Sequence, residues 1–339
     1  MRYRKLGGTG LDLSEIAFGC GGNAGLMVRG TAAEQEHAVG RALDLGINYF
    51  DNSPDYGDGR AEEALGRALK SLRQRPLVNS KVEIRAADLA DIAGHVERSV
   101  EASLIRLGLD HLDVLQIHNG PSTQPVRLEG KVYARLSVDD YERPGGALEG
   151  VRRILTKGKA RVAGFICRGD DGADVRRILS AGNMYLINVP YTLLNPTAGR
   201  IKPAGLQVDR DYGQVIGAAA AAGGGAAIYS PLAGGFLTEE TIAQRARHPL
   251  ARPARGSEAE VEGQRAKAAA FAFLTEATGL TLAQAAIRFI LMNDDVTTVL
   301  GGFSSETQLE ETVRAAAAPA FTADILTRIE AAWAADLAG

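Results

Sequence analysis

Eight short apolar runs recur along the 339 residues of this chain, and longer stretches with helical periodicity separate them. The runs have the length and the branched or aromatic composition of buried strands. Strands that alternate with helices in this way form a parallel sheet, and eight such units in about 300 residues fit a closed barrel better than an open sheet. We therefore predict an α/β protein with a (β/α)₈ TIM barrel, whose strands span residues 15–19, 47–50, 76–81, 112–118, 160–165, 185–190, 226–230 and 296–300.

Two segments lie outside these eight units. Residues 3–19 predict a β-hairpin that turns at Gly7–Gly10 and leads into the first barrel strand, and residues 323–338 predict a final helix. No Pro- or Ser-rich linker interrupts the chain. We therefore expect one domain over residues 1–339.

The composition argues against several classes of function. A formal charge of −3 gives no basic footprint for nucleic acid. The charges at the N-terminus are not followed by an apolar core, so we expect no signal peptide. The two cysteines, Cys20 and Cys167, suggest no disulfide framework, and the cytoplasm is the simplest expected location. Residues 212–238 carry no charge, but a glycine triplet and a proline interrupt them, so we expect a buried helix end and a core strand rather than a membrane span.

Two long loops follow predicted strands, at residues 119–144 and 231–260. Both leave the C-terminal ends of strands, the rim that carries the active site in barrels of this type. Long loops at that rim often cover a ligand. Charged residues of the first loop would either meet a polar carbonyl compound such as a sugar or form a solvated face: Arg127, Lys131, Arg135, Asp139, Asp140 and Arg143.

Four polar side chains follow or end three successive predicted strands. Asp51 and Tyr56 follow the second, Lys81 ends the third and His118 ends the fourth. Neighbouring strands lie about 4.8 Å apart, so the four side chains should converge on one rim. Taken singly, Asp51 has the alternative of a turn residue, Tyr56 of a surface aromatic and His118 of a core histidine. Their coincidence at consecutive strand ends favours a site.

Binding a metal ion is an alternative role for His118. His111 lies seven residues before His118, which separates them by about 23 Å along a strand. No Cys-x-x-Cys or His-x-x-x-His spacing occurs in the sequence. We therefore predict no metal site.

The chemistry available to these four residues is proton transfer. A phenol has a pKa of about 10, but an ammonium about 4 Å away contributes roughly 4 kcal/mol at an effective dielectric constant of 20, enough to bring the phenol toward neutrality. Asp51 would hold Lys81 in place and keep it charged, and His118 would donate to a substrate oxygen or orient it. The set suggests carbonyl reduction with Tyr56 as the acid, and since it supplies no hydride, a cofactor must.

The sequence resembles the aldo-keto reductases. The resemblance runs from the N-terminus to about position 318, and the matching stretches are "NYFDNSPDYGDGRAEEALGRAL", "LVNSKV", "LIRLGLDHLDVLQIH", "GKARVAGF", "INVPYTLLN", "AIYSPLAGGFLT" and "TTVLGGFSSETQLEETV". It implies a (β/α)₈ barrel, a catalytic tetrad of Asp51, Tyr56, Lys81 and His118, and a nicotinamide cofactor, usually NADPH.

The resemblance also implies cofactor-binding residues. Tyr229 matches the tyrosine that stacks on the nicotinamide, the stretch from Ser230 to Gly235 matches the loop around the pyrophosphate, and "GGFSSETQ" matches the adenosine phosphate site. The implied contacts are Asp51, Asn188, Tyr229, Ser230, Leu232, Gly234, Gly302, Phe303, Ser304, Gln308, Glu311 and Thr312.

This chain departs from the family pattern in three places. Asn188 replaces the usual glutamine, and Ile166 with Cys167 replaces the usual Ser-Asn pair at the carboxamide. Residues 300–313 contain no Lys or Arg, although relatives that prefer NADPH usually carry one there. NADP(H) is therefore only weakly favoured over NAD(H). Arginines of the second long loop are the possible partners of a 2′-phosphate: Arg245, Arg247, Arg252 and Arg255.

Two other interpretations compete with an aldo-keto reductase enzyme. "GCGGNA" at residues 19–24 fits a Rossmann glycine motif, but the following residues do not open a helix. A cofactor-binding regulatory subunit, as in the potassium-channel β-subunits that resemble this family, is the alternative to an enzyme, and the intact tetrad favours turnover. A small carbonyl or sugar-like substrate is expected, with the reaction direction and the oligomeric state left open.

Overall fold

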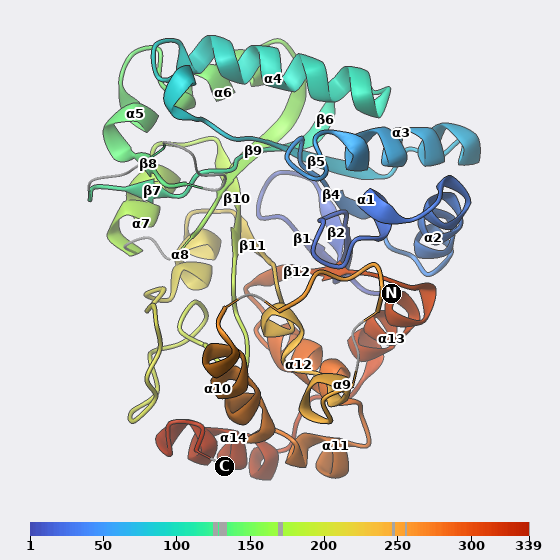
Figure 1. Cartoon of the computed structure of the whole chain (residues 1–339). Coiled ribbons are helices and arrows are strands. Elements are labelled where there is room, and N and C mark those ends of the chain that lie inside the picture. The colour runs from blue at the N-terminus through green and yellow to red at the C-terminus, as the bar shows by residue number, and fades with distance from the viewer. Residues whose placement is uncertain (125–127, 129–133, 169–171, 246–247, 255, 339) are drawn as a thin grey trace.

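Eight parallel strands close into a barrel in the computed structural model of the chain (Figure 1). The structure describes residues 1–124, 128, 134–168, 172–245, 248–254 and 256–338. Each barrel strand pairs with the next along the chain, and the last pairs with the first. The strands are β3 (Ile16–Gly19), β4 (Tyr49–Asp51), β5 (Leu77–Val82), β6 (Leu112–Ile117), β9 (Ala160–Ile166), β10 (Met184–Val189), β11 (Gly225–Ile228) and β12 (Val296–Gly302). The predicted barrel and its eight strands are confirmed, with ends that differ by one or two residues.

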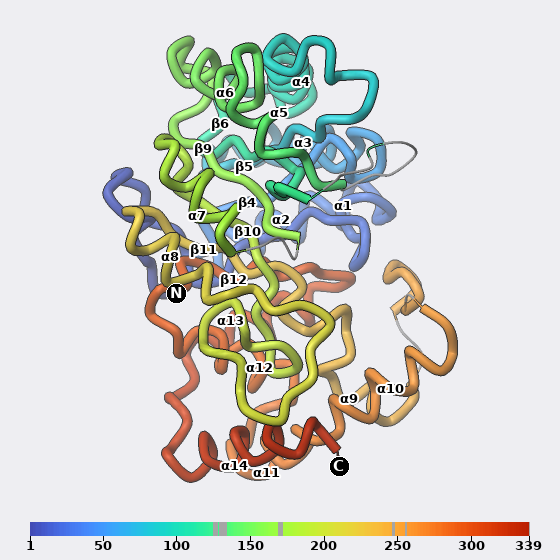
Figure 2. The backbone as a smooth tube through the Cα atoms, turned by 90° about the vertical axis from the view of Figure 1, so that its left-hand side faces the viewer, coloured from blue at the N-terminus to red at the C-terminus, as the bar shows by residue number. Residues whose placement is uncertain are grey.

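A helix follows each barrel strand, and together these helices surround the barrel (Figures 1 and 2). Their inner faces follow from the sequence: in α4, Ile92, Val96, Val100 and Leu104 recur every four residues and are buried. The surrounding helices are α2 (Ala32–Asp44), α3 (Arg60–Leu72), α4 (Ile92–Leu107), α6 (Ala147–Thr156), α7 (Gly172–Ser180), α8 (Val215–Ala221), α12 (Leu282–Leu291) and α13 (Glu306–Ala317).

Short elements occupy the loops at the C-terminal rim. The loop after β6 holds the two-stranded parallel sheet β7 (Pro121–Ser122) and β8 (Leu136–Ser137), followed by α5 (Val138–Glu142). The loop after β11 holds η2 (Ala233–Gly235) and α9 (Glu239–Ile242), and it leads into α10 (Glu258–Ala269) and α11 (Phe273–Thr278). α1 (Leu26–Arg29) and η1 (Ala86–Asp88) follow β3 and β5. A third long connection, residues 190–214 after β10, was not predicted and contains no helix or strand in the structure.

The predicted hairpin and C-terminal helix are both present. β1 (Tyr3–Lys5) and β2 (Asp12–Ser14) pair antiparallel, with left-handed φ angles of 48° at Gly7 and 76° at Gly10 in the turn. Leu6, Leu11 and Leu13 are buried in a cluster with residues from inside the barrel, so the hairpin closes the end opposite the functional rim. α14 (Ala323–Ala334) lies against the β10–α8 connection, where the Trp333 indole N–H donates to the Leu193 carbonyl at 2.7 Å.

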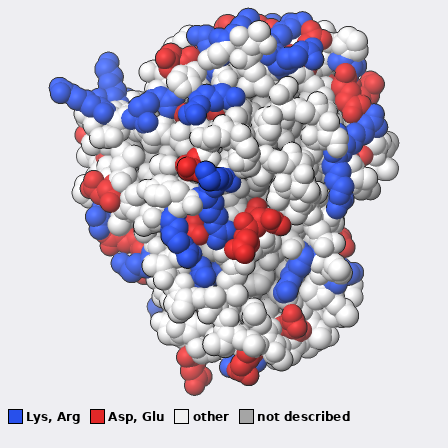
Figure 3. Space-filling model, turned by 180° about the vertical axis from the view of Figure 1, so that it is seen from behind, with Lys and Arg blue, Asp and Glu red and all other residues white. Residues whose placement is uncertain are grey.

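Charges of both signs are mixed on the surface, as Figure 3 shows for the face seen from behind. Many charged side chains of the described residues pair locally: Arg153 on α6 and Lys157 directly after it both contact Glu97 on α4, and Arg177 contacts Glu142. Such pairs on exposed surface contribute little to stability.

Within the described residues, no single helix has the length and apolarity that crossing a membrane requires. One helix pair bent by 89°, Glu258–Thr278 with Leu282–Leu291, has the required length and composition.

Candidate active site

The four residues of the predicted set come together at the C-terminal rim of the barrel. Asp51 is the last residue of β4, Lys81 lies one residue before the end of β5, and His118 directly follows β6. Tyr56 lies in the turn that joins β4 to α3. The strand register explains the convergence, since Asp51 pairs with Asn79 on β5 and Lys81 pairs with Gln116 on β6.

A buried ion pair forms the centre of the site. The Lys81 ammonium donates to Asp51 Oδ1 and to the Asn52 carbonyl, both at 2.6 Å, and all but 2% of each charged residue is buried. Burial lowers the pKa of Lys81, while the charge of Asp51 opposes this shift. The ammonium lies 5.1 Å from the centroid of the Tyr56 ring. A fixed positive charge therefore stands beside the phenol.

Two amide side chains hold the other oxygen of Asp51, and a third amide links these two. Asp51 Oδ2 accepts from Asn79 Nδ2 at 2.7 Å and from Asn188 Nδ2 at 3.1 Å. Gln116 joins these amides: its Oε1 accepts from Asn79 at 3.0 Å and its Nε2 donates to Asn188 Oδ1 at 2.8 Å. The network fixes the carboxylate from the inside of the barrel. The predicted contact of Asn188 with a cofactor carboxamide stays a prediction, because this side chain already bonds to Asp51 and Gln116.

Sequence reasoning missed Asn79 and Gln116, although a signal for them existed. Asn79 precedes Lys81 by two residues, and Gln116 precedes His118 by two. Residues two apart on a strand point to the same face. Polar residues at these positions of apolar strands therefore belong on the face that carries the site.

A tight turn places Tyr56. Three consecutive left-handed residues follow it, with φ angles of 67° at Gly57, 56° at Asp58 and 86° at Gly59, after which α3 begins. Asn52 donates through its side chain to the Ala61 carbonyl at 3.1 Å and so ties the strand end to the helix. The Tyr56 ring meets the His118 ring edge-on, with centroids 6.1 Å apart.

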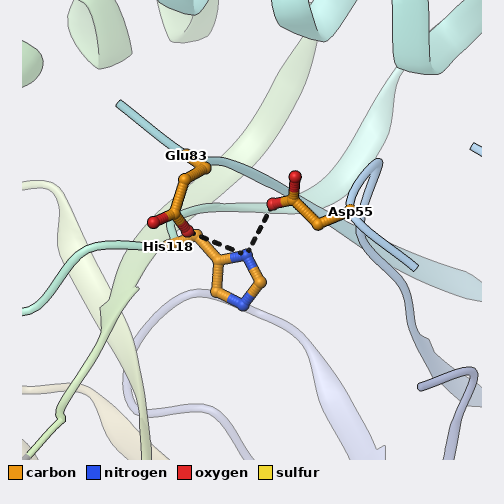
Figure 4. Close-up of side chains that lie close together, drawn as sticks. All are labelled: Asp55, Glu83 and His118. Carbon is orange, nitrogen blue, oxygen red and sulfur yellow. Dashed lines mark hydrogen bonds and ion pairs between the residues drawn. The ribbon is translucent and has the colours of Figure 1, made fainter. Parts of the chain in front are cut away.

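His118 has oxygen atoms of three side chains around its Nδ1 atom. Asp55 Oδ2 and Ser53 Oγ lie at 3.3 Å and Glu83 Oε2 at 3.5 Å, and Figure 4 shows the two carboxylates on the same side of the ring. Burial, with the charges of Lys81 and Arg168, lowers the pKa of His118 to about 3, although the hydrogen bond to Asp55 opposes this. The imidazole is therefore neutral at physiological pH.

The two carboxylates were not among the predicted site residues. Burial alone would raise the pKa of Asp55, but its hydrogen bond with His118 and the nearby charges, Arg85 among them, hold it below its ordinary value. Glu83 follows Lys81 by two residues on the same buried face, the signal that could have identified it. Asp55, Glu83 and His118 each offer a possible metal-ligand atom, and these atoms lie within 4.8 Å of one another. The predicted absence of a metal stays a prediction.

The turn after β11 contains several of the predicted cofactor-binding residues. Tyr229 follows the strand directly, and its hydroxyl donates to the Cys167 carbonyl at 3.1 Å. Left-handed φ angles follow at Ser230 (49°), Ala233 (49°) and Gly234 (73°). Turns of this kind point successive N–H groups toward one side and favour an anion there. A Cβ added to Gly234 would meet no atom within 4 Å, so the space over this backbone is open. The predicted contacts of Tyr229 with the nicotinamide, and of Ser230, Leu232 and Gly234 with the pyrophosphate, stay predictions.

The segment after β12 is held more closely by the protein itself. Gly302 ends the strand, and Phe303 is buried with its ring centroid 5.1 Å from that of Phe18. Ser304 is buried, and its hydroxyl donates to the Ala24 carbonyl at 2.7 Å. The Gln308 side chain accepts from the Ser304 N–H at 2.8 Å. The predicted phosphate contacts of Ser304 and Gln308 stay predictions.

The acidic residues of α13 face α2. Glu306 contacts His37 at 2.8 Å and Arg41 at 3.6 Å, and Glu310 contacts Arg41 at 2.5 Å. Part of the negative charge of these two carboxylates is therefore balanced by α2. Thr312 is buried and Glu311 is half-buried on the same helix.

Ile166 and Cys167 are both buried at the end of β9. Ile166 pairs in register with Asn188, and the Cys167 N–H donates to the Asn188 carbonyl at 2.8 Å. Neither side chain carries the amide or hydroxyl of the family pattern. The effect of these two residues on the binding of a nicotinamide stays a prediction.

The loop after β11 crosses to the loop after β3. The Arg252 N–H donates to the Asn23 carbonyl at 2.7 Å, and Arg29 Nε donates to the Leu250 carbonyl at 2.9 Å. This contact brings Arg252 and Arg29 to the rim. Four of the basic residues named in the two predicted loops lie outside the described residues: Arg127, Lys131, Arg247 and Arg255.

The fold and the site together define an α/β-barrel protein whose C-terminal rim holds groups suited to proton transfer. A family model described as the aldo/keto reductase family matches residues 15–334. The chain therefore belongs to this family of oxidoreductases, and the resemblance found in the sequence is confirmed.

Individual relatives span nearly the whole chain. L-galactose dehydrogenase of Arabidopsis thaliana is 27% identical over 333 residues, 93% of this chain and 88% of the relative. L-glyceraldehyde 3-phosphate reductase of Escherichia coli is 27% identical over 358 residues, 97% and 92% of the two chains. A probable voltage-gated potassium channel subunit beta of Oryza sativa subsp. japonica is 26% identical over 345 residues, 98% and 96%.

A solved structure supports the fold. The holo form of aldo-keto reductase AKR11C1 from Bacillus halodurans superposes with a TM-score of 0.69 at 22% identity, covering 99% of this chain and 97% of the other.

Proposed function

We propose that this protein catalyses NAD(P)(H)-dependent interconversion of aldehydes or ketones and alcohols, with Tyr56 as the proton donor for reduction. The observation that carries the proposal is the buried Lys81–Asp51 pair beside the Tyr56 ring. A buried cation is costly unless an anion pairs with it, as Asp51 pairs with Lys81 here. Next to a phenol, this cation stabilises the negative charge that develops when the proton leaves.

Each residue has a distinct part in this proposal. A nicotinamide cofactor supplies or accepts the hydride when bound. Tyr56 gives its proton to the substrate oxygen, Lys81 stabilises the resulting phenolate, and Asp51 keeps Lys81 in position. His118 contacts the substrate oxygen or a neighbouring group. Tyr229 and the backbone after β11 would hold the cofactor, since a glycine-rich turn with open space suits a pyrophosphate.

The relatives suggest a substrate class. One is named as a dehydrogenase of L-galactose and another as a reductase of L-glyceraldehyde 3-phosphate. Both names denote carbonyl compounds that carry hydroxyl groups or a phosphate, which agrees with a polar, sugar-like substrate here. We extend the proposal to a cytoplasmic setting, since the two cysteines, Cys20 and Cys167, are buried and form no disulfide.

The alternative is a cofactor-binding subunit with little turnover, the type of protein that the potassium-channel relatives represent by name. The intact ion pair beside Tyr56 favours catalysis. The two readings differ in a steady-state assay: absorbance of the reduced nicotinamide is followed with NADPH and NADH over a panel of sugars, aldehydes and ketones. The proposal expects turnover above background with at least one substrate. Tight cofactor binding without turnover on any substrate would favour the subunit.

The same assay tests the cofactor preference. Residues 300–313 contain no Lys or Arg that could bind a 2′-phosphate. We therefore expect the ratio of kcat/KM for NADPH to that for NADH to lie below about 10³, which corresponds to about 4 kcal/mol. A larger ratio would mean that a basic group elsewhere, such as Arg252, recognises the phosphate.

A further inference from the structure

We propose that Arg85, held in place by Asp55, is a specificity-determining residue that binds hydroxyl groups of a neutral, polyhydroxylated aldehyde or ketone. The inference rests on the proposed function, and it narrows the sugar-like substrate class to compounds without a phosphate or carboxylate group. It concerns the rim beside Tyr56 and leaves the proton transfer itself unchanged.

Arg85 stands on the rim in the connection that follows β5. It comes three residues after the end of the strand and directly before η1, and its backbone N–H donates to Asp88 Oδ2 at 2.8 Å. Both backbone groups of the preceding residue, Ile84, bond to the side chain of Asn119, at 2.8 and 3.0 Å. The segment that carries Arg85 is thus fixed to the residue that follows His118.

Two short contacts link the Arg85 guanidinium to the centre of the site. Arg85 Nη2 donates to Asp55 Oδ1 at 2.7 Å, and Asp55 Oδ2 lies 3.3 Å from Nδ1 of His118, the second of these contacts being drawn in Figure 4. Asp55 also directly precedes Tyr56 in the chain. Arg85 is therefore one side chain away from His118, within the reach of a substrate several carbon atoms long.

The guanidinium group is accessible as well as fixed. The side chain of Arg85 is 53% exposed, whereas that of Asp55 is only 10% exposed. A guanidinium carries several N–H groups in a rigid fork. Within the part of the chain that the structure describes, the contact with Asp55 occupies one nitrogen of this fork, Nη2. The other N–H groups of Arg85 can therefore donate to a bound molecule.

The charge next to Arg85 favours a neutral partner. Burial alone would raise the pKa of Asp55, but its hydrogen bond with His118 and nearby charges, Arg85 among them, hold it below its ordinary value, so the acid is ionised at neutral pH. This carboxylate balances the guanidinium and would repel a phosphate or carboxylate brought to the same place. A hydroxyl group both donates and accepts. An acid and a guanidinium side by side therefore suit neighbouring hydroxyls better than an anion.

The alternative is an ion pair with a structural role only. Arg98 on α4 forms such a pair with Asp91 at 2.8 Å, with side chains 64% and 61% exposed, and pairs of this kind contribute little to stability. The pair at the rim differs, because Asp55 is nearly buried and contacts His118. Arg98 therefore serves as the matched control.

The test compares Arg85→Gln with the native protein on a set of aldehydes that have equal carbon chains. Butanal carries no hydroxyl group, erythrose carries one on every carbon atom beyond the carbonyl, and erythrose 4-phosphate exchanges the terminal hydroxyl for a phosphate. Oxidation of the reduced nicotinamide gives kcat/KM for each aldehyde. Because each comparison is between two proteins on the same aldehyde, intrinsic reactivity and ring closure cancel.

We expect kcat/KM for erythrose to fall about 10- to 100-fold in Arg85→Gln, the worth of one hydrogen bond to a charged group. The value for butanal should stay close to native, since butanal has no group for Arg85 to bind. Arg98→Gln should leave both values unchanged. A structural role of the ion pair would instead lower the values for butanal and erythrose together.

Asp55→Asn tests the charge argument. The native protein should prefer erythrose to erythrose 4-phosphate. The variant should shift this preference toward the phosphate by about 3- to 10-fold, because it removes a negative charge beside the guanidinium. The preference is the quantity compared, since the variant also changes the contact with His118.

Three results would overturn the inference. They are an unchanged kcat/KM for erythrose in Arg85→Gln, equal losses on butanal and erythrose, and a native preference for erythrose 4-phosphate. Thermal unfolding checks that the variants fold. If Arg85→Gln does not, Arg85→Lys takes its place and should show a smaller loss on erythrose alone, because lysine keeps the charge but not the fork.

A binding measurement separates this inference from the proposed function. If no aldehyde is turned over, the proposed function fails, and saturation-transfer NMR with the polyol erythritol then tests Arg85. The native protein should give a signal that Arg85→Gln loses and Arg98→Gln keeps. Equal signals in the native protein and Arg85→Gln, or none in either, would contradict a hydroxyl-binding role of Arg85.

Discussion

At the scale of single residues, the site is defined by which polar groups are buried and what they contact. Lys81 and Asp51 depend on each other in the barrel. Removing one partner of a buried ion pair leaves an uncompensated charge and costs about 3–5 kcal/mol of stability. The amides of Asn79, Gln116 and Asn188 then fix the carboxylate. Preorganisation of this kind is what a proton-transfer site requires.

The buried state of His118 predicts a pH dependence of stability. Its pKa is about 3 in the folded protein and 6.5 for an ordinary histidine, so between these values the unfolded chain binds more protons than the folded one. The free energy of unfolding therefore falls as the pH falls through this window. Between pH 7 and pH 5 the native protein should lose about 2 kcal/mol more than His118→Gln. Urea unfolding at both pH values measures this.

Equal losses in the two proteins would contradict a neutral, buried His118. The subtraction of the variant removes the contribution of other titrating groups. Asp55, whose pKa is lowered, affects stability only at more acidic pH, since its ordinary value is 3.8.

Ile166 and Cys167 carry a second prediction at this scale. Replacement by Ser and Asn should tighten binding of the reduced cofactor by about 0.5–1.5 kcal/mol for each hydrogen bond gained. Fluorescence titration with NADPH measures the affinity. Cys167→Ala is the control, since alanine adds no donor or acceptor. Weaker binding in the Ser/Asn variant would mean that these positions do not face the carboxamide.

At the scale of elements, close approach between neighbouring strands sets which residues are tolerated. Gly164 on β9 pairs with Leu186 on β10, and a Cβ at Gly164 would lie 1.8 Å from the Leu186 carbonyl oxygen. No rotation of a side chain relieves a contact with backbone. The barrel must therefore shift if any side chain is placed there.

Gly164→Ala should accordingly destabilise the protein by about 1–3 kcal/mol, the usual cost of overpacking a core. Gly263→Ala is the matched control: Gly263 lies within α10, and no atom stands within 4 Å of its added Cβ. The control should be neutral or stabilise by about 0.5–1 kcal/mol. Thermal unfolding of both variants measures the difference, and similar stabilities would show that the β9–β10 contact is looser than the structure has it.

The elements themselves were largely predictable, because periodicity and strand composition are local properties of the sequence. The contacts between elements were less so. Asn79 and Glu83 have the signal of a shared strand face, but their partners on other strands depend on register, which barrel closure sets. The bond from Arg29 to Leu250 joins positions 221 apart, and no sequence pattern predicts such a contact between loops.

At the scale of the whole molecule, the barrel separates stability from chemistry. The hairpin β1–β2 closes one end with Leu6, Leu11 and Leu13, and Arg4 there donates to the carbonyls of Asn293 and Val296. The opposite rim gathers the ends of β4, β5 and β6 with the loops after β3, β11 and β12. The predicted rim was correct because parallel strands in a closed barrel bring all their C-terminal ends to one side.

The central claim is that Tyr56 transfers the proton, and Tyr56→Phe tests it most directly. The variant keeps the ring beside Lys81 and His118 but removes the hydroxyl. Turnover, measured as oxidation of the reduced nicotinamide with the best substrate of the panel, should fall by about 10²–10⁴, while cofactor affinity from fluorescence titration stays unchanged. Near-native turnover in a variant that binds cofactor normally would contradict the account.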